Sequence, residues 1–138
     1  PCGISNYKVK TSWTAGPPPP NSFGPGGFDS TTWLVSSTFD TQVNGGAAFN
    51  SILWQGNQPS GTRVGFQIAS SNNPSGPWTT YLGPGGSTTV YEPGAPNKQM
   101  KISRQDHNNK QYVRYKMYLS WSGSQGPRVD DVVISYSP

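Results

Sequence analysis

The longest alternation of apolar and polar residues in the chain runs from Lys110 to Trp121. Successive side chains of a β-strand point to opposite faces, so this period of two predicts a long strand with one face in a core. Apolar side chains are expected on that buried face: Val113, Tyr115, Met117, Leu119 and Trp121. A mixture of aromatic and basic side chains is expected on the opposite face: Tyr112, Arg114, Lys116, Tyr118 and Ser120.

A second strand is expected from Val129 to Tyr136, after the turn-forming sequence SGSQGP. Glycine and proline favour a hairpin loop at this position, and two consecutive strands joined in this way usually pair. The pattern therefore predicts a C-terminal hairpin at the centre of the fold.

Shorter alternating segments precede this hairpin, and clusters of glycine, proline and asparagine separate them. Strands are expected at residues 4–13, 32–41, 47–55, 62–70, 78–82, 88–91 and 98–103. No long segment has the spacing of an amphipathic helix. Turn signals about every 8–12 residues predict an all-β protein, an antiparallel β-sandwich of the jelly-roll or Greek-key type with roughly seven to nine strands and little or no helix.

Composition divides the chain into three regions. Residues 1–14 are expected to form an N-terminal strand, residues 15–30 a linker rich in proline and glycine, and residues 31–138 the β-sandwich domain. Successive prolines favour polyproline II, a semi-rigid spacer of about 3.1 Å per residue. The first strand can fold back as an edge strand of its own sheet, or it can pair with a neighbouring subunit. In the second case the subunit-contact candidates are Tyr7, Val9, Thr11 and Trp13.

The overall composition excludes several classes of protein. A chain of 138 residues has room for one domain with a modest core. Only 12% of the residues are charged, and uncharged polar residues and glycine supply the surface, as is typical of a secreted or cell-surface β protein. The net charge of +4 comes from scattered residues, and no nucleic-acid-binding module is recognisable. An extracellular or cell-surface location is therefore expected, with no nucleic-acid partner.

The chain begins with Pro1 rather than methionine, and Cys2 is its only cysteine. We therefore expect it to be processed or excised from a longer protein, with any export signal or anchor upstream. A single cysteine excludes a disulfide within the chain, so Cys2 can pair upstream, pair between molecules or stay free. No apolar run approaches the ~18 residues of a membrane-spanning helix, so no membrane span is expected in this chain.

No pattern in the sequence indicates a reaction, so an enzyme is not expected. His107 is the only histidine, and it lies in the polar sequence DHNN, where turn geometry alone accounts for the Asp and Asn residues. One cysteine and one histidine far apart make no zinc site. Asp130 and Asp131 can join loop carbonyls around calcium, although ion pairs with nearby basic residues fit them better. We expect no catalytic residue, no metal site and no cofactor, with calcium as the one alternative.

The aromatic content is high, with five Trp, seven Tyr and five Phe. In so small a domain some of these rings remain at the surface, where a flat ring can stack on a sugar. The alternative is that the rings pack the two sheets and the tyrosine hydroxyls reach water at the rim. The candidate glycan-binding residues are Trp78, Tyr81, Tyr112, Arg114 and Tyr118.

Several segments form a recognisable series: FDSTTWLVSSTFDT, NSILWQGNQPSGTRVGFQIASSN, SGPW, HNNKQYVRYKMYLSW and PRVDDVVISY. Together they resemble a sandwich domain of bacterial surface proteins, including pilin-like proteins in which a methylated N-terminal helix precedes such a domain. The resemblance covers about residues 29–136 and specifies no site residue. It implies a non-enzymatic extracellular role, as the exposed part of a pilin-like filament subunit or an adhesin, although the apolar helix that defines a pilin is absent here. The alternative function is a carbohydrate-binding module.

Overall fold

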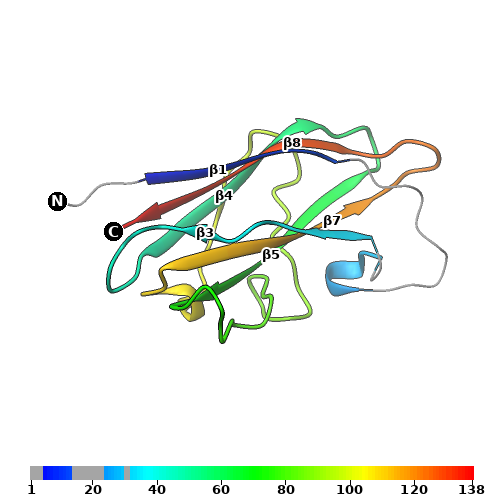
Figure 1. Cartoon of the computed structure of the whole chain (residues 1–138). Helices are drawn as coiled ribbons and strands as arrows, with labels where there is room; N and C mark the ends of the chain where they lie inside the picture. The colour runs from blue at the N-terminus through cyan, green and yellow to red at the C-terminus, as the bar shows by residue number, and fades with distance from the viewer. Residues whose placement is uncertain (1–4, 14–23, 30–31) are drawn as a thin grey trace.

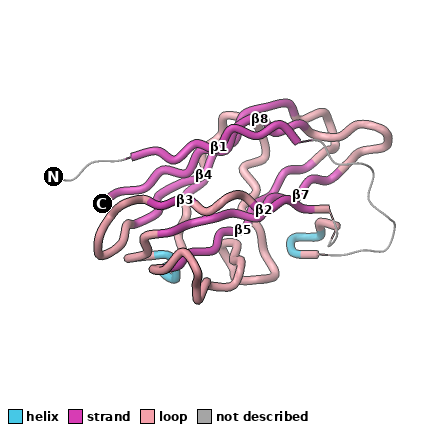
Figure 2. Tube along the Cα trace, viewed as in Figure 1, coloured by secondary structure: helices cyan, strands magenta, loops and turns pink. Residues whose placement is uncertain are grey.

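The computed structural model describes residues 5–13, 24–29 and 32–138 of the chain. In these residues, eight strands and two short 3-10 turns form an antiparallel β-sandwich of two layers (Figure 1, Figure 2). The strands are β1 (Ser5–Trp13), β2 (Trp33–Val35), β3 (Phe39–Asp40), β4 (Ala48–Asn57), β5 (Arg63–Ser71), β6 (Met100–Lys101), β7 (Tyr112–Ser120) and β8 (Arg128–Ser137). The turns are η1 (Pro25–Gly27) and η2 (Gln105–His107). The predicted all-β sandwich is confirmed.

The two sheets divide the strands in a characteristic order. One sheet has the order β1-β8-β4-β6, and the other has β7 between β5 and the successive short strands β2 and β3. Beyond β5, Leu82 and Tyr91 continue the second sheet through backbone hydrogen bonds to Ile68 and Phe66. The chain thus passes repeatedly from one sheet to the other, and its first strand lies beside its last, which is the wrapping of a jelly roll.

The predicted C-terminal hairpin is wrong. β7 pairs with β5, β2 and β3, whereas β8 pairs with β1 and β4, so these two long strands lie in opposite layers. The glycine- and proline-containing segment 121–127 joins the two layers. In this topology, β7 and β8 are consecutive in the sequence but belong to opposite sheets of the sandwich.

The core lies between the two sheets, and the alternation in β5 and β7 supplies most of one side. Buried side chains of this sheet include Val64, Phe66, Ile68, Val113, Tyr115, Met117 and Leu119. They pack against buried side chains of the other sheet, including Phe49, Ile52, Trp54, Val132 and Ile134. The predicted inward face of β7 is confirmed except at Trp121, which is half-buried just beyond the strand, against Gly126.

Two β-bulges interrupt the alternation where β4 pairs with β8. The register shifts between Phe49 and Ser51 on β4, and again where Asp131 and Val129 on β8 take successive partners. An extra residue in one strand reverses which side chains face the core. Phe49 and Ile52 are therefore both buried although they are three positions apart, and Val129 and Val132 are buried for the same reason.

Some predicted short strands are divided or reduced in the structure. The segment 32–41 forms β2 and β3, because the Ser36 hydroxyl accepts the Tyr115 N–H at 3.0 Å where a strand would offer a carbonyl. The segments 78–82 and 88–91 contribute single bridges at Leu82 and Tyr91, on either side of the turn that contains Gly83. The segment 98–103 retains only the two residues of β6.

The N-terminal strand lies in its own sheet. β1 is an edge strand that pairs antiparallel with β8, from Ser5 opposite Tyr136 to Trp13 opposite Val129 (Figure 1). Of the two predicted arrangements, this is the one in which the strand folds back. Cys2 and most of the predicted linker lie outside the described residues.

Candidate functional site

Two segments cover part of the outer face of the β5–β7 sheet. Residues 24–29 lie over one end of it, and the long loop 72–91 lies over β5 (Figure 1). As a result, β5 is buried on both faces from Val64 to Ser71. The part of this face that remains open belongs mainly to β7 and β2.

Phe28 shows that the last part of the predicted linker is packed against the sandwich. Its ring is 1% exposed and lies over Gly65, where an added Cβ would come within 2.7 Å of the ring. Arg63 holds the segment in place, because its Nη2 donates to the Gly26 carbonyl at 2.9 Å and its Cζ lies 4.1 Å from the centre of the Phe28 ring. Residues 24–29 therefore do not act as a spacer.

Tyr118 was predicted to contact a ligand, and the structure corrects this placement. Tyr118 points to the outer face as expected, but it is only 2% exposed, with the Phe28 ring 5.8 Å away. Its hydroxyl donates to Gln67 Oε1 at 3.0 Å, and Gln67 Nε2 donates to the carbonyls of Ser87 and Thr89. The covering segments thus bury Tyr118, so its ring lies beneath the exposed surface and is not part of it.

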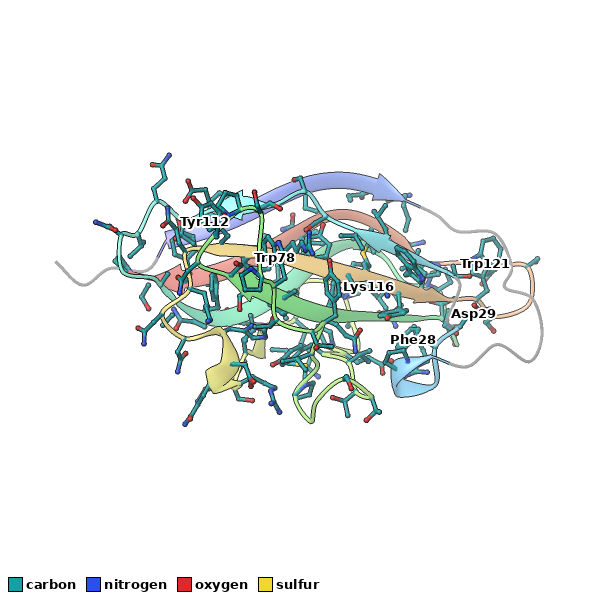
Figure 3. All side chains as sticks on the ribbon, turned by 60° about the horizontal axis from the view of Figure 1, so that its bottom comes forward. Phe28, Asp29, Trp78, Tyr112, Lys116 and Trp121 are labelled. Carbon is teal, nitrogen blue, oxygen red and sulfur yellow. The ribbon has the colours of Figure 1, made fainter. Side chains whose placement is uncertain are left out.

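On the open part of the face, cations and aromatic rings alternate. Arg114 Cζ lies 4.0 Å from the centre of the Trp78 ring and 5.6 Å from that of Tyr81. Lys116 Nζ lies 5.6 Å from the Tyr81 ring centre and 4.3 Å from that of Trp33. We call Trp33, Lys116, Tyr81, Arg114 and Trp78 the cation–aromatic row. Figure 3 shows two members, Trp78 and Lys116, over the middle of this face.

The two cations share a face because they are two positions apart on β7, a separation of ~7 Å along the strand. Trp33 on β2 pairs in register with Tyr118, which places its ring on the same outer face, diagonal to Lys116. Trp33 is 43% exposed, an unusual exposure for a large apolar side chain among the residues from 24 onward that the structure describes. Two strands that are far apart in the sequence therefore supply one side of the row.

The loop 72–91 supplies the other side of the row, and β5 holds the loop. Thr79 donates its N–H to the Ser70 carbonyl at 2.9 Å and accepts the Ser70 N–H on its hydroxyl at 3.0 Å. Leu82 exchanges two backbone hydrogen bonds of 2.9 Å with Ile68. These bonds fix the backbone on both sides of Tyr81 and next to Trp78, so the two rings are positioned by the sheet.

The cation–aromatic row carries net positive charge. The ion pairs made by arginines in the described residues lie elsewhere: Arg63–Glu92, Arg104–Asp106 and Arg128–Asp130. Burial raises the pKa of Tyr81 and that of Tyr118 beneath it, so both hydroxyls keep their protons at neutral pH. No described carboxylate pairs with Arg114 or Lys116, and the neighbouring tyrosines add no negative charge.

The structure brings together three of the five candidate glycan-binding residues: Trp78, Tyr81 and Arg114. Tyr112 is half-buried near one end of β7, toward the end of the sheet opposite Phe28 (Figure 3). The candidate list lacked Trp33 and Lys116. The alternation already placed Lys116 beside Arg114, whereas the position of Trp33 depends on a strand pairing that no local pattern indicates.

His107 and Ser70 form a buried pair that sequence reasoning missed. His107 Nδ1 lies 2.7 Å from Ser70 Oγ, and the two residues are 1% and 0% exposed. A Ser–His pair acts in catalysis only where a substrate reaches the hydroxyl. This pair lies inside the domain, so its geometry serves packing and does not form an active site.

Other kinds of site receive little support from the described residues. Asp130 is one of the two aspartates considered as calcium ligands, and it forms an ion pair with Arg128 at 3.1 Å. Within the described ranges, no group of three or more His, Cys, Asp or Glu side chains is arranged to hold a metal ion. A shallow groove at the β4–β6 edge is lined by Asn50, Ser51, Gln99, Lys101 and Ile102, without an aromatic ring. In the part of the chain that is described, no helix has the length and apolarity of a membrane crossing.

Comparison of the chain with known protein families, with curated proteins and with solved structures finds no match. The resemblance to bacterial surface domains therefore rests on the sequence segments that carry it. The surface chemistry of the described residues is therefore what bears on the function.

Proposed function

We propose that this chain is a non-enzymatic binding domain of an extracellular surface protein, and that the cation–aromatic row binds a glycan. The observation that carries the proposal is the row itself, in which Trp33, Tyr81 and Trp78 lie on an outer sheet face beside two cations that no described carboxylate pairs with. Aromatic faces offer flat apolar surfaces for sugar rings, and the neighbouring N–H groups can donate to sugar oxygens.

Packing of the core does not account for the rings of the row. The aromatic side chains that fill the space between the sheets are others, such as Trp54, Phe66 and Tyr91, each 0% exposed. Trp33 lies on the opposite side of its sheet and keeps 43% of its surface exposed. Exposed cation–π contacts contribute only about 0.5–1 kcal/mol each, so stabilisation of the loop is a weak reason for such a surface.

Trp33→Ala is expected to weaken binding to a recognised glycan by about tenfold or more, because truncated tryptophans at binding surfaces commonly have effects of this size. The measurement is a screen of the wild-type chain on a glycan array, followed by calorimetry with the glycan that binds. Thermal unfolding of the variant checks that the fold is retained.

Trp121→Ala is the matched control, since Trp121 lies outside the row, toward the far end of the sheet from Tyr112 (Figure 3). It is expected to keep the wild-type affinity. A wild-type chain that binds no glycan on the array contradicts the proposal, as does equal loss of binding in the two tryptophan variants.

A pilin-like filament subunit is a second candidate, and the position of β1 favours it. β1 lies at a sheet edge beside β8, and the sequence between β1 and η1 contains four successive prolines. The β1 strand of a second copy could make the same backbone hydrogen bonds to β8, which is strand addition between subunits.

Assembly of the chain is expected under this second candidate, and deletion of residues 1–20 is expected to abolish it. Light scattering across a concentration series measures the mass of both forms. Because the deletion also exposes the edge of β8, the full chain provides the decisive result. A full chain that stays monomeric at every concentration contradicts exchange of β1 between subunits.

A further inference from the structure

We infer that the glycan held by the cation–aromatic row is acidic, a polysaccharide whose sugars carry carboxylate or sulfate groups. This inference rests on the proposed function and adds the chemical class of the ligand. Neutral sugars need only rings and hydrogen-bonding groups, whereas this surface adds two positive charges that no described carboxylate neutralises.

The contacts with aromatic rings do not neutralise the charges of Arg114 and Lys116. A ring attracts a cation through its quadrupole but carries no net charge, so Arg114 on Trp78 and Lys116 on Trp33 remain cationic. Both side chains are half-buried, so they sit where a pairing anion is screened less than in open water. Hydrogen bonds between ionised partners are about twice as strong as those between neutral groups.

The row also fixes where an anion would sit. A guanidinium that lies on a ring face still presents N–H donors at its edge, in the fork geometry that matches two oxygens of a carboxylate or sulfate. The ammonium of Lys116 lies near three rings, with Trp33 at 4.3 Å and Tyr81 and Tyr118 at 5.6 Å. Side chains held in place lose less entropy when a ligand binds.

The extent of the charge favours an acidic glycan over a nucleic acid. Single-stranded nucleic acid carries a phosphate at every nucleotide and is held by a basic groove that follows the backbone. Here the cations of the row are the neighbouring Arg114 and Lys116, flanked by rings. Two cations with an exposed Trp33 suit a chain that alternates anionic groups with apolar ring faces.

The test compares polygalacturonate, dextran sulfate and neutral dextran as ligands of the full chain by calorimetry. We expect binding to one or both acidic polymers, weakened when NaCl is raised from about 50 mM to about 500 mM, because salt screens exposed charges. Polygalacturonate and dextran sulfate distinguish carboxylate from sulfate recognition. Arg114→Gln and Lys116→Gln are each expected to weaken this binding by about tenfold.

Lys101→Gln is the matched control, because it removes the same charge from an exposed lysine of the other sheet. It is expected to keep wild-type binding. Binding to neutral glycans with no effect of the two Gln variants of the row overturns the acidic class and leaves the proposed function standing. Absence of binding to these polymers and to the glycan array overturns both. Equal weakening by Lys101→Gln, or stronger binding to a single-stranded oligonucleotide, also overturns the inference.

Discussion

Phe66→Ala is expected to lower the free energy of unfolding by about 3–5 kcal/mol, the usual cost of removing a fully buried aromatic side chain. Phe66 is 0% exposed and meets the Tyr115 ring edge-on, with ring centres 5.8 Å apart. Its backbone hydrogen bonds to Tyr91, at 2.8 and 2.9 Å, do not depend on the side chain. The substitution therefore reports the cavity left between the two sheets, and chemical denaturation measures it.

Trp121→Ala provides the comparison for this experiment. The alternation in the sequence placed Trp121 in the core, whereas the structure leaves it half-buried beyond the end of β7. We therefore expect a smaller loss of stability from Trp121→Ala than from Phe66→Ala. A loss below about 1 kcal/mol for Phe66→Ala would mean that the inward face of β5 is displaced by one residue.

The strands β5 and β7 were predictable from the sequence because their pairing is uninterrupted. They align without a bulge from Arg63 opposite Ser120 to Ser71 opposite Tyr112, so a strict period of two survives in the amino-acid pattern. The register of β4 was not predictable, because the bulge at Asn50 brings Phe49 and Ile52 to one face. A bulge leaves no local sequence signal as clear as alternation.

The pairing of whole strands was the larger failure of sequence reasoning. A short connection rich in glycine and proline fits a hairpin and a passage between two sheets equally well, because both need a tight change of direction. Only the global arrangement, in which β1 and β4 occupy both sides of β8, excludes β7 as its partner. A local sequence pattern does not indicate whether the two edges of a strand are already paired with other strands.

The candidate site was predictable in its cations and only partly in its rings. Alternation alone places Arg114 and Lys116 on one face of β7. The cations contact Trp78 and Tyr81 because the loop 72–91 folds back along β5. Trp33 lies beside them because β2 pairs with β7. For the same reason Tyr118, which shares the face with the cations, is buried by a distant segment that the composition presented as a spacer.

Acidification from pH 7 to pH 4 is expected to destabilise the fold through His107. Burial lowers the pKa of His107 from 6.5 to about 4; Asp106 opposes this shift, while Arg104 and Lys110 add to it. Nε2 has no hydrogen-bond partner among the described residues, so a protonated ring would bury an unpaired N–H as well as a charge. Protonation therefore favours the unfolded chain, in which the imidazole is solvated.

The sign follows from proton linkage. Above pH 6.5 the ring is neutral in both states and has no pH-dependent effect, whereas between pH 6.5 and about 4 only the unfolded state takes up the proton. Over this range the free energy of unfolding is expected to fall by about 3 kcal/mol on account of this one group, and the loss is complete below the folded pKa. Carboxylates add their own pH dependence, so the effect of His107 must be isolated.

Two measurements isolate it. Chemical denaturation of the wild type and of His107→Gln at several pH values should give stability curves that converge by about 3 kcal/mol between pH 7 and pH 4, since glutamine does not titrate. Because His107 is the only histidine, its ring proton signal in NMR spectra of the wild type also reports its pKa without assignment and without a variant. Parallel stability curves, or a signal that titrates near 6.5, would show that the imidazole reaches water and that the Ser70–His107 contact is not sealed within the fold.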